Sequence, residues 1–311
     1  MSGPVGKRIL VTGASGLVGF PLSIALAEAG NEVFAAARFT DSSQAVPLET
    51  AGVRCLRFDL ASQDLSNLPP EVDLVYHLGA LTDARLPQAT LLEVNAQATG
   101  RIVSRYREVE AFVHAGSGSS YAHNEGIPMA EDGPLGLHGP GLENYSLSKI
   151  VAESVLRHAA AEWQVPTVIL RCFTMYGPRG GAVAARIGQM RRGLPIQLYP
   201  GQPNRYSLLY EDDFVEMFLR AAALASTPAL IVNLAGSEPI DVVDYCRFAG
   251  QLLGIEPTFE ESAAAYYPLL ADTTKMETLL GKTQVRPLDG IRRVVEGDPA
   301  LMLAQWRSFL D

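Results

Sequence analysis

The sequence predicts an α/β fold in which a parallel sheet is covered by helices on both faces. Three observations predict it. Short apolar runs alternate with helix-length patterns through roughly the first 170 residues, as a doubly wound sheet requires. A glycine-rich turn, Gly13–Gly19, joins the first apolar run to the first helical pattern. Proline and glycine become frequent after about Phe173, which indicates a smaller, mixed C-terminal lobe.

Each element follows from its residue pattern. Short apolar runs bounded by polar or glycine positions predict strands, and longer runs with helical spacing predict helices. The predicted strands are Arg8–Thr12, Glu32–Ala37, Val53–Phe58, Val72–Leu78, Ala111–Ala115 and Thr167–Cys172. The predicted helices are Leu17–Ala29, Leu91–Glu108 and Asn144–Ala161. We also expect Ala229–Asn233 to return to the main sheet, and Asp212 and Asp213 to cap a helix that starts near Phe214.

The change in pattern predicts two parts. Residues 1–172 together with about 211–237 form the expected dinucleotide-binding domain. Residues from about 173 to 210 and from 238 to 311 form the expected substrate-binding lobe. Because 311 residues are enough for one large or two modest domains, this division is compatible with the chain length.

Composition excludes several classes of protein. The formal net charge of −9 gives no global attraction to nucleic acid or to anionic membranes. The three cysteines, Cys55, Cys172 and Cys246, are odd in number and widely spaced, so neither a disulfide framework nor a metal centre is expected. No stretch of ~20 apolar residues can span a bilayer, and the first residues lack the apolar segment of a signal peptide. We therefore expect a cytoplasmic protein.

The turn Gly13-Ala14-Ser15-Gly16-Leu17-Val18-Gly19 predicts a phosphate-binding loop. Glycine lets the backbone turn tightly and approach a pyrophosphate closely, and the helix that follows offers free N–H groups with a partial positive charge. The spacing G-x-x-G-x-x-G differs from the usual dinucleotide spacing. Its position between the first strand and the first helix favours a dinucleotide ligand over a turn without function.

Residues at the end of the second strand favour NADP(H) over NAD(H), although NAD(H) stays possible. An acidic residue there would bind the ribose hydroxyls and repel a 2′-phosphate. The sequence has Ala37 followed by Arg38 instead, and a guanidinium can hold a phosphate through two parallel hydrogen bonds. Asp41 can still reach the ribose, and Asp59 is a candidate contact for the adenine amino group.

Tyr145 and Lys149 lie four residues apart in a helical pattern and therefore share one face of that helix. A tyrosine with an ordinary pKa near ~10 is a poor base at neutral pH, and a nearby ammonium favours its phenolate. Tyr145 can then exchange a proton with a carbinol or ketone while hydride moves to or from a nicotinamide. Ser117, just past a strand end, can hold the same substrate oxygen.

Together these residues resemble the extended short-chain dehydrogenase/reductase family, also called the NAD-dependent epimerase/dehydratase family. Six segments in order carry the resemblance over nearly the whole chain. They are the T-G-x-x-G-x-x-G loop Thr12–Gly19, the H-L-A-A-like His77–Ala80, the N-x-x-x-T pair Asn95 and Thr99, the segment Phe112–Tyr121 that resembles the strand leading into S-S-x-x-V-Y-G, the Y-x-x-S-K segment Tyr145–Lys149, and Pro166–Pro178.

The resemblance implies a Rossmann-type fold, a homodimer, and site residues for each ligand. The implied catalytic residues are Ser117, Tyr145 and Lys149. The implied cofactor contacts are Gly13, Ser15, Gly16, Leu17, Val18, Gly19, Arg38, Asp59, Leu60, Leu78, Gly79, Ala80, Asn95, Tyr145, Lys149, Cys172 and Thr174. Leu194–Asp212 is similar to the family's sugar-nucleotide segment, and the implied substrate contacts are Ser119, Thr174 and Arg205, the last at the diphosphate.

Departures from the family pattern narrow the reaction. Gly118 and Ser119 stand where family dehydratases of the 4,6 type carry Asp-Glu. Elimination of water needs acids that donate and accept protons, so the resemblance disfavours dehydration and likewise decarboxylation. Gly116, Ala122 and Thr174 also replace family residues, and Thr174 stands where the family has an asparagine.

Several functions stay open. The leading one is hydride transfer at a carbinol or ketone of a nucleotide-activated sugar, either as an epimerase or as a 4-ketoreductase. An NADPH-dependent reductase of a small non-sugar ketone or aldehyde is a second possibility. A non-catalytic NADP(H)-binding protein is a third, disfavoured because Tyr145 and Lys149 are both present.

Overall fold

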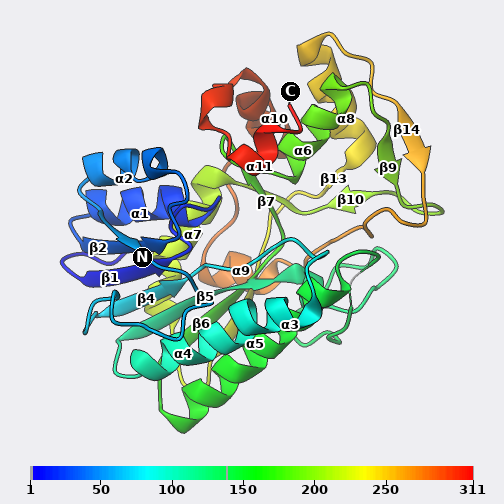
Figure 1. Cartoon of the computed structure of the whole chain (residues 1–311). Helices are drawn as coiled ribbons and strands as arrows, with labels where there is room; N and C mark the ends of the chain where they lie inside the picture. Colours follow the sequence, from blue (N-terminus) through cyan, green and yellow to red (C-terminus); the bar gives the residue numbers. More distant parts are fainter. Residues whose placement is uncertain (1–2, 138, 311) are drawn as a thin grey trace. The chain divides into compact units, whose positions relative to one another are not determined.

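The computed structural model describes residues 3–137 and 139–310, which form two compact units (Figure 1). Unit 1 consists of Met1–Ser120, Asn144–Arg171 and Val215–Val232. Unit 2 consists of Tyr121–Glu143, Cys172–Phe214 and Asn233–Asp311. The predicted domains were defined by the ligand each would bind, and the compact units do not test that assignment. The segment 121–143, which the sequence placed in the first domain, belongs to unit 2.

A seven-stranded sheet organises unit 1, in the order β12-β6-β5-β4-β1-β2-β3. Its strands are β1 (Arg8–Thr12), β2 (Glu32–Ala37), β3 (Arg54–Arg57), β4 (Leu74–His77), β5 (Ala111–Ser117), β6 (Thr167–Cys172) and β12 (Leu230–Leu234). The neighbours from β5 across to β3 run parallel. This strand order is that of a Rossmann-type doubly wound sheet, which confirms the predicted fold class.

The inner strands of this sheet are largely apolar because helices cover both of its faces, whereas the edge strand β3 carries exposed arginines. Ile9, Leu10 and Val11 in β1 are all fully buried, as expected for a strand with no solvent-facing side. A hydrophobic core of unit 1 joins Phe34, Val75 and Phe112 from the sheet to Ile102 and Leu156 from helices. The run Ala229–Asn233 was predicted to return to the main sheet, and β12 confirms this.

Helices cover both faces of the unit 1 sheet. Figure 1 shows α1 and α2 on one face and α4 and α5 on the other. The helices of this part are α1 (Gly19–Glu28), α2 (Val46–Thr50), α3 (Gln88–Leu91), α4 (Ala98–Arg105), α5 (Glu143–Glu162) and α7 (Glu211–Ala221), which continues from unit 2 into unit 1. Leu26 and Leu156, from α1 and α5, are fully buried.

The single helix predicted over Leu91–Glu108 is wrong in one respect. A π-helical stretch, Leu92–Gln97, stands between α3 and α4. Asn95 lies in this stretch and uses its side chain to bind the backbone of Leu81. π turns are uncommon and are found mostly where function requires a side chain at an irregular position, which makes Asn95 a residue to follow in the site.

Unit 2 has its own small sheets and its own core. Its sheets are β11-β7-β8, β10-β13 and β14-β9. Their strands are β7 (Thr174–Gly177), β8 (Gly180–Gly181), β9 (Ile196–Leu198), β10 (Arg205–Tyr206), β11 (Leu208–Tyr210), β13 (Ile240–Asp241) and β14 (Phe259–Glu261). Its remaining helices are α6 (Ala182–Arg191), α8 (Val242–Leu253), α9 (Thr274–Leu279), α10 (Pro287–Glu296) and α11 (Ala304–Arg307). Val183, Tyr245 and Ile291 bring three of these helices into one core.

The predicted cap of the helix near Phe214 is wrong. The helix α7 already begins at Glu211, so Asp212 and Asp213 lie within its first turn. The carboxylate of Asp213 instead accepts hydrogen bonds from the backbone N–H groups of Gln284 and Val285, at 2.7 and 2.9 Å. The sequence could not show this use because the partners lie about seventy residues away.

Candidate functional site

The glycine turn after β1 is folded so closely that side chains cannot enter it. Gly13 has a φ of +70°, and a Cβ there would lie 2.5 Å from the Cα of Gly79. A Cβ at Gly19 would lie 2.4 Å from the carbonyl oxygen of Gly13. Both positions therefore need glycine for conformation and for close approach of the backbone.

The start of α1 presents free amide groups beside this turn. The N–H groups of Leu17, Val18 and Gly19 bind no acceptor among the described residues, whereas the N–H of Gly16 is used by the carbonyl of Gly13. Free N–H groups at the N-terminus of a helix, with the partial positive charge of its dipole, suit a pyrophosphate. The cradle left by the missing Cβ atoms and these amides fits the phosphates of a dinucleotide.

Some of the other predicted cofactor contacts lie beside the glycine turn. A Cβ at Gly79 would lie 2.6 Å from Cδ1 of Leu60 and 3.1 Å from the nitrogen of Gly13, so these three residues lie together. Asp59 is exposed, and its carboxylate accepts the backbone N–H of Ala61 at 3.0 Å. Asp59 thus stabilises the local turn, and its role as an adenine contact stays a prediction.

Two arginines end adjacent strands near this turn. Arg38 follows Ala37 of β2, and Ala37 pairs in register with Arg57 of β3. Both arginines are exposed, and neither forms an ion pair or a side-chain hydrogen bond with another described residue. Asp41, the nearby acid, has a carboxylate oxygen committed to the N–H of Ser43. Arg57 is a residue that the sequence analysis missed, because only the register places it beside Ala37.

A buried chain of hydrogen bonds runs below the glycine turn. Nδ1 of His77 lies 2.8 Å from the hydroxyl of Thr12, and its Nε2 lies 2.9 Å from the hydroxyl of Thr99. Thr99 donates its own proton to the carbonyl of Asn95, so it accepts from Nε2–H of His77. Nδ1 then accepts from Thr12. His77 is therefore fully buried and hydrogen-bonded through both ring nitrogens.

The same network reaches the helix that carries Tyr145 and Lys149. The amide of Asn95 donates to the hydroxyl of Ser148 at 2.9 Å, and Ser148 donates to the carbonyl of Tyr145 at 2.7 Å. Asn95, predicted as a cofactor contact, has both atoms of its side-chain amide engaged with protein groups. In this structure Asn95 joins the segment near Leu81 to the start of α5.

Lys149 is held in a fixed place. Its Nζ donates to the carbonyl of Ala115 in β5 at 2.6 Å, and its side chain is buried. Burial lowers the pKa of His77 to about 3, and the ammonium of Lys149 adds to this effect. His114 stacks on His77, and its pKa is lowered for the same two reasons. Lys149 therefore faces two neutral imidazoles rather than competing cations.

Ser117 and Tyr145 complete the predicted catalytic set. Tyr145 lies four residues before Lys149 on α5 and is half-buried, so its face of the helix is shared with the ammonium. Ser117 ends β5, the strand whose Ala115 binds Lys149. The hydroxyl of Ser117 lies 2.9 Å from the hydroxyl of Ser119. The three predicted catalytic residues and Ser119 thus all belong to unit 1.

The other predicted ligand residues belong to unit 2. Cys172 is buried at the end of β6, and Thr174 is half-buried at the start of β7. Arg205 is exposed in β10, where it pairs in register with Asp241. An exposed guanidinium is available to a phosphate. The side chain of Cys172 is buried, and its role as a cofactor contact stays a prediction.

A buried carboxyl in unit 2 escaped the sequence analysis. Glu211 lies at the start of α7, and burial raises its pKa to about 7 although the charge of Arg179 opposes this. A Cβ at Gly177 would lie 2.9 Å from Oε2 of Glu211, so the carboxyl packs against the bare backbone of that glycine. Glu211 belongs to an acidic run that is typical of a solvent-exposed helix start. Its carboxyl is buried only through packing in the tertiary structure.

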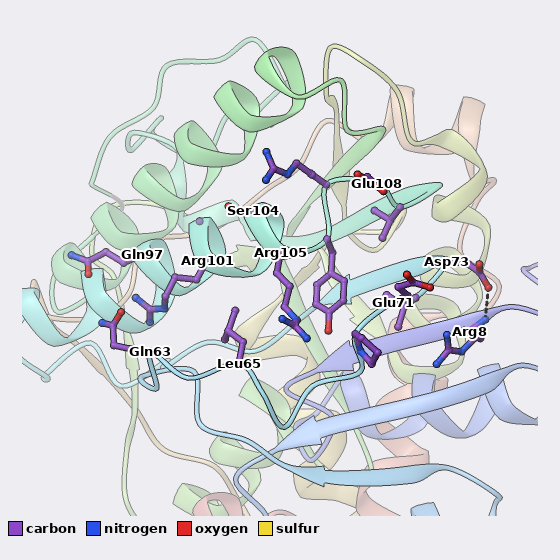
Figure 2. Close-up of a pocket in the computed structure, with 16 residues that line it drawn as sticks. Arg8, Gln63, Leu65, Glu71, Asp73, Gln97, Arg101, Ser104, Arg105 and Glu108 are labelled. Atoms are coloured by element: carbon purple, nitrogen blue, oxygen red, sulfur yellow. Dashed lines mark hydrogen bonds between the residues drawn. The ribbon is translucent and has the colours of Figure 1, made fainter.

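A hollow at the opposite edge of unit 1 is not a second candidate. Figure 2 shows it lined by Arg8, Asp73, Arg101 and Arg105. Arg8 and Asp73 mark the amino ends of β1 and β4, whereas ligands of such sheets bind at the carboxyl ends. Arg101 and Arg105 donate to the carbonyls of Leu60 and Leu68 and so hold the loop before β4.

The comparison with protein families decides the identity. Residues 9–235 match the model of the NAD dependent epimerase/dehydratase family. The chain belongs to this family. The match includes the glycine turn, Ser117, Tyr145 and Lys149, and it confirms the predicted family and an NAD-dependent enzyme of the epimerase/dehydratase type.

Individual relatives cover most of the chain. A probable UDP-glucuronate 4-epimerase of Rhizobium meliloti is 24% identical over 93% of this chain and 96% of its own length. A dTDP-4-dehydro-6-deoxy-D-allose reductase of Streptomyces bikiniensis is 25% identical over 80% of this chain and 82% of its own. A solved structure, MoeE5 in complex with UDP-glucose and NAD, aligns with a TM-score of 0.77 and 26% identity over 93% of this chain and 97% of that one.

Within residues 3–137 and 139–310, no helix has the length and apolar character needed to cross a bilayer. The same residues contain no group of three or more His, Cys, Asp or Glu side chains placed to hold a metal ion. The expectation of no metal centre stays a prediction.

Proposed function

We propose that this chain transfers hydride at a carbinol or ketone of a nucleotide-activated sugar, as an epimerase or a 4-ketoreductase. One observation carries the proposal. Unit 1 contains two groups of residues: the glycine turn after β1 with its free amides, and a set made of the fixed Lys149, Tyr145 on the same helix and Ser117 at the end of β5. A phosphate-binding turn alone would support only cofactor binding. The set Ser117, Tyr145 and Lys149 adds the groups needed for proton transfer.

The roles of the chain's own residues follow from their chemistry. Tyr145 takes the proton of a substrate carbinol during oxidation and returns it to the ketone during reduction. Lys149 stabilises the phenolate form of Tyr145 by its charge. Ser117 donates a hydrogen bond to the same substrate oxygen as negative charge develops there. A bound nicotinamide supplies the hydride chemistry.

Epimerisation and reduction differ only in whether the cofactor is consumed. An epimerase oxidises a ring carbinol and reduces the other face of the ketone, so the cofactor is regenerated. A ketoreductase consumes its reduced cofactor. The relatives include both kinds by name. Dehydration stays disfavoured because Gly118 and Ser119 cannot exchange the protons that elimination requires.

The cofactor that we propose is NADP(H). Relatives have been crystallised with NAD, which supports a nicotinamide dinucleotide of one of the two kinds. The choice of NADP(H) rests on Arg38 and Arg57, which are exposed on neighbouring strand ends and bind no carboxylate of residues 3–137 or 139–310. It also rests on Ala37, where an acid would select NAD(H). A 2′-phosphate would supply the negative counter-charge for these two guanidinium groups.

The substrate that we propose is a nucleotide sugar, whose diphosphate Arg205 would bind through its guanidinium. Support comes from the exposure of Arg205 and from relatives that act on or bind UDP-sugars and a dTDP-sugar. A homodimer and a cytoplasmic location, both predicted from sequence, complete the proposal. Sedimentation of the purified protein would measure the oligomeric state directly.

The test of this function combines product analysis with one variant. The purified protein is incubated separately with UDP-glucuronate, UDP-glucose and a dTDP-4-keto-6-deoxy sugar, with NADPH or NADH added in the last case. We expect an epimerised or a reduced sugar in at least one reaction. Tyr145→Phe should lower turnover by at least about a hundredfold while the cofactor still binds.

The cofactor released on denaturation separates the two reactions. Tightly held oxidised cofactor with an epimerised product identifies an epimerase, and stoichiometric NADPH oxidation identifies a ketoreductase. Turnover by Tyr145→Phe at the rate of the unaltered protein would overturn the mechanism. Reduction of small ketones without any reaction of nucleotide sugars would overturn the proposed substrate class.

A further inference from the structure

Ser117 and Ser119 form a closed pair in the turn after β5. Their hydroxyl oxygens lie 2.9 Å apart, and the backbone N–H of Ser119 donates to the hydroxyl oxygen of Ser117 at 3.2 Å. Both residues are nearly buried, at 7% and 5% exposure, so water does not compete freely for these bonds. Within the described residues, the hydroxyl of Ser119 has no hydrogen-bond partner other than Ser117.

The arrangement leaves one useful direction for the proton of Ser117. A hydroxyl oxygen can accept two hydrogen bonds and donate one. The N–H of Ser119 fills one acceptor position of Ser117, and the hydroxyl of Ser119 can fill the other. The proton of Ser117 is then free to point at a third group. Accepting two hydrogen bonds also polarises the Ser117 hydroxyl and makes it a stronger donor.

We propose that Ser119 is a positioning residue, which acts on the substrate only through Ser117. It directs the Ser117 proton toward the substrate oxygen as charge develops on that oxygen. This inference rests on the proposed function, in which Ser117 is the hydrogen-bond donor. It differs from the expectation that Ser119 itself binds substrate, which stays a prediction: here the single proton of Ser119 is used on Ser117.

The proposal predicts a specific kinetic pattern. A positioning residue that strengthens a bond made mainly in the transition state should change kcat and leave KM nearly unchanged. Loss of one neutral hydrogen bond of this kind should lower kcat about tenfold. The effect should disappear when Ser117 is absent, because Ser119 then has nothing to direct.

The experiment uses two variants of equal shape. Ser119→Thr keeps a hydroxyl, and Ser119→Val replaces it with a methyl group while adding the same bulk. Each is made alone and together with Ser117→Ala, and kcat and KM are measured with the sugar nucleotide turned over in the assays above. Thermal melting of both variants shows whether the turn has tolerated the added methyl. Ser120→Ala, a buried change in the same turn, is the control for packing.

We expect Ser119→Val to lower kcat about tenfold relative to Ser119→Thr, with KM within about twofold and no such difference in the Ser117→Ala background. An increase in KM, or effects of the two positions that simply multiply, would overturn the inference and make Ser119 a direct substrate contact. Unchanged turnover of Ser117→Ala would instead overturn the proposed role of Ser117, so the two failures are distinguishable.

Discussion

Arg171 and Glu153 form a bidentate ion pair that is almost completely buried in unit 1. Nε and Nη2 of Arg171 donate to the two carboxylate oxygens of Glu153 at 2.8 and 2.6 Å, and both side chains are at most 3% exposed. Glu153 lies one helical turn beyond Lys149 on α5, and Arg171 lies in β6. The pair therefore ties the helix with Lys149 and Tyr145 to the sheet at a defined position.

Removing one partner of this pair should destabilise the protein strongly. Glu153→Gln keeps the side-chain shape but leaves the guanidinium of Arg171 without a counter-charge, so we expect the free energy of unfolding to fall by about 3–5 kcal/mol. Chemical denaturation measures the loss. Glu216→Gln, which breaks the exposed pair with Arg220, is the control and should change stability by less than about 1 kcal/mol. Equal effects of the two variants would contradict the argument.

The buried carboxyl of Glu211 should make stability depend on pH. Its pKa in the folded protein is raised from 4.5 to about 7, so the folded protein keeps a proton that the unfolded chain loses. This contribution to stability is present below pH ~4.5 and is lost as the pH rises through about 7. The shift corresponds to at most about 3 kcal/mol.

Glu211→Gln isolates this contribution. Gln cannot ionise, so the variant should gain stability relative to the unaltered protein as the pH rises from 5 to 8, measured as the difference in melting temperature at each pH. Glu296→Gln is the control for loss of a surface carboxylate and should show no such trend, because Glu296 is exposed, pairs with Arg292 and is not among the charges that act on Glu211. A melting difference for Glu211→Gln that stays constant with pH would rule out a raised pKa.

The two arginines at the ends of β2 and β3 should set the cofactor preference. Arg38→Ala and Arg57→Ala should each weaken NADPH binding about tenfold or more and leave NADH binding nearly unchanged, because only NADPH carries the 2′-phosphate. Fluorescence titration with both cofactors measures the ratio. Arg54→Ala is the matched control on β3, since Arg54 is already paired with Glu32. An unchanged ratio in all three variants would exclude a 2′-phosphate site here.

The side chain of Asn95 should contribute strongly to stability because it forms several hydrogen bonds at once. Asn95→Ala removes hydrogen bonds to the N–H and carbonyl of Leu81 and to Ser148, which lie in a buried region. We expect a loss of about 2–4 kcal/mol from the groups left unpaired. Asn144→Ala, which removes one longer bond to Leu86, is the comparison. A similar melting temperature for both variants would show that the Asn95 network is not needed.

The chain order of strands and helices was readable because it depends on local patterns. Glu32–Ala37 and Thr167–Cys172 were predicted with their observed bounds, since an apolar run between turn residues is a short-range property. The helix from Leu91 was predicted without its π turn, because that irregularity depends on where Asn95 finds the backbone of Leu81. The pattern of apolar residues contains no information about that partner.

The sequence by itself determined the family, the glycine turn, and the set Ser117, Tyr145 and Lys149. Residue type and spacing along the chain are enough to recognise a tight glycine turn and side chains that can transfer protons. Only the tertiary structure decided which polar groups meet. It placed His77 between Thr12 and Thr99, Ser119 on Ser117, and Glu211 in a buried position that raises its pKa. These outcomes depend on packing between segments distant in the chain, and burial then sets how strongly each charge and hydrogen bond acts.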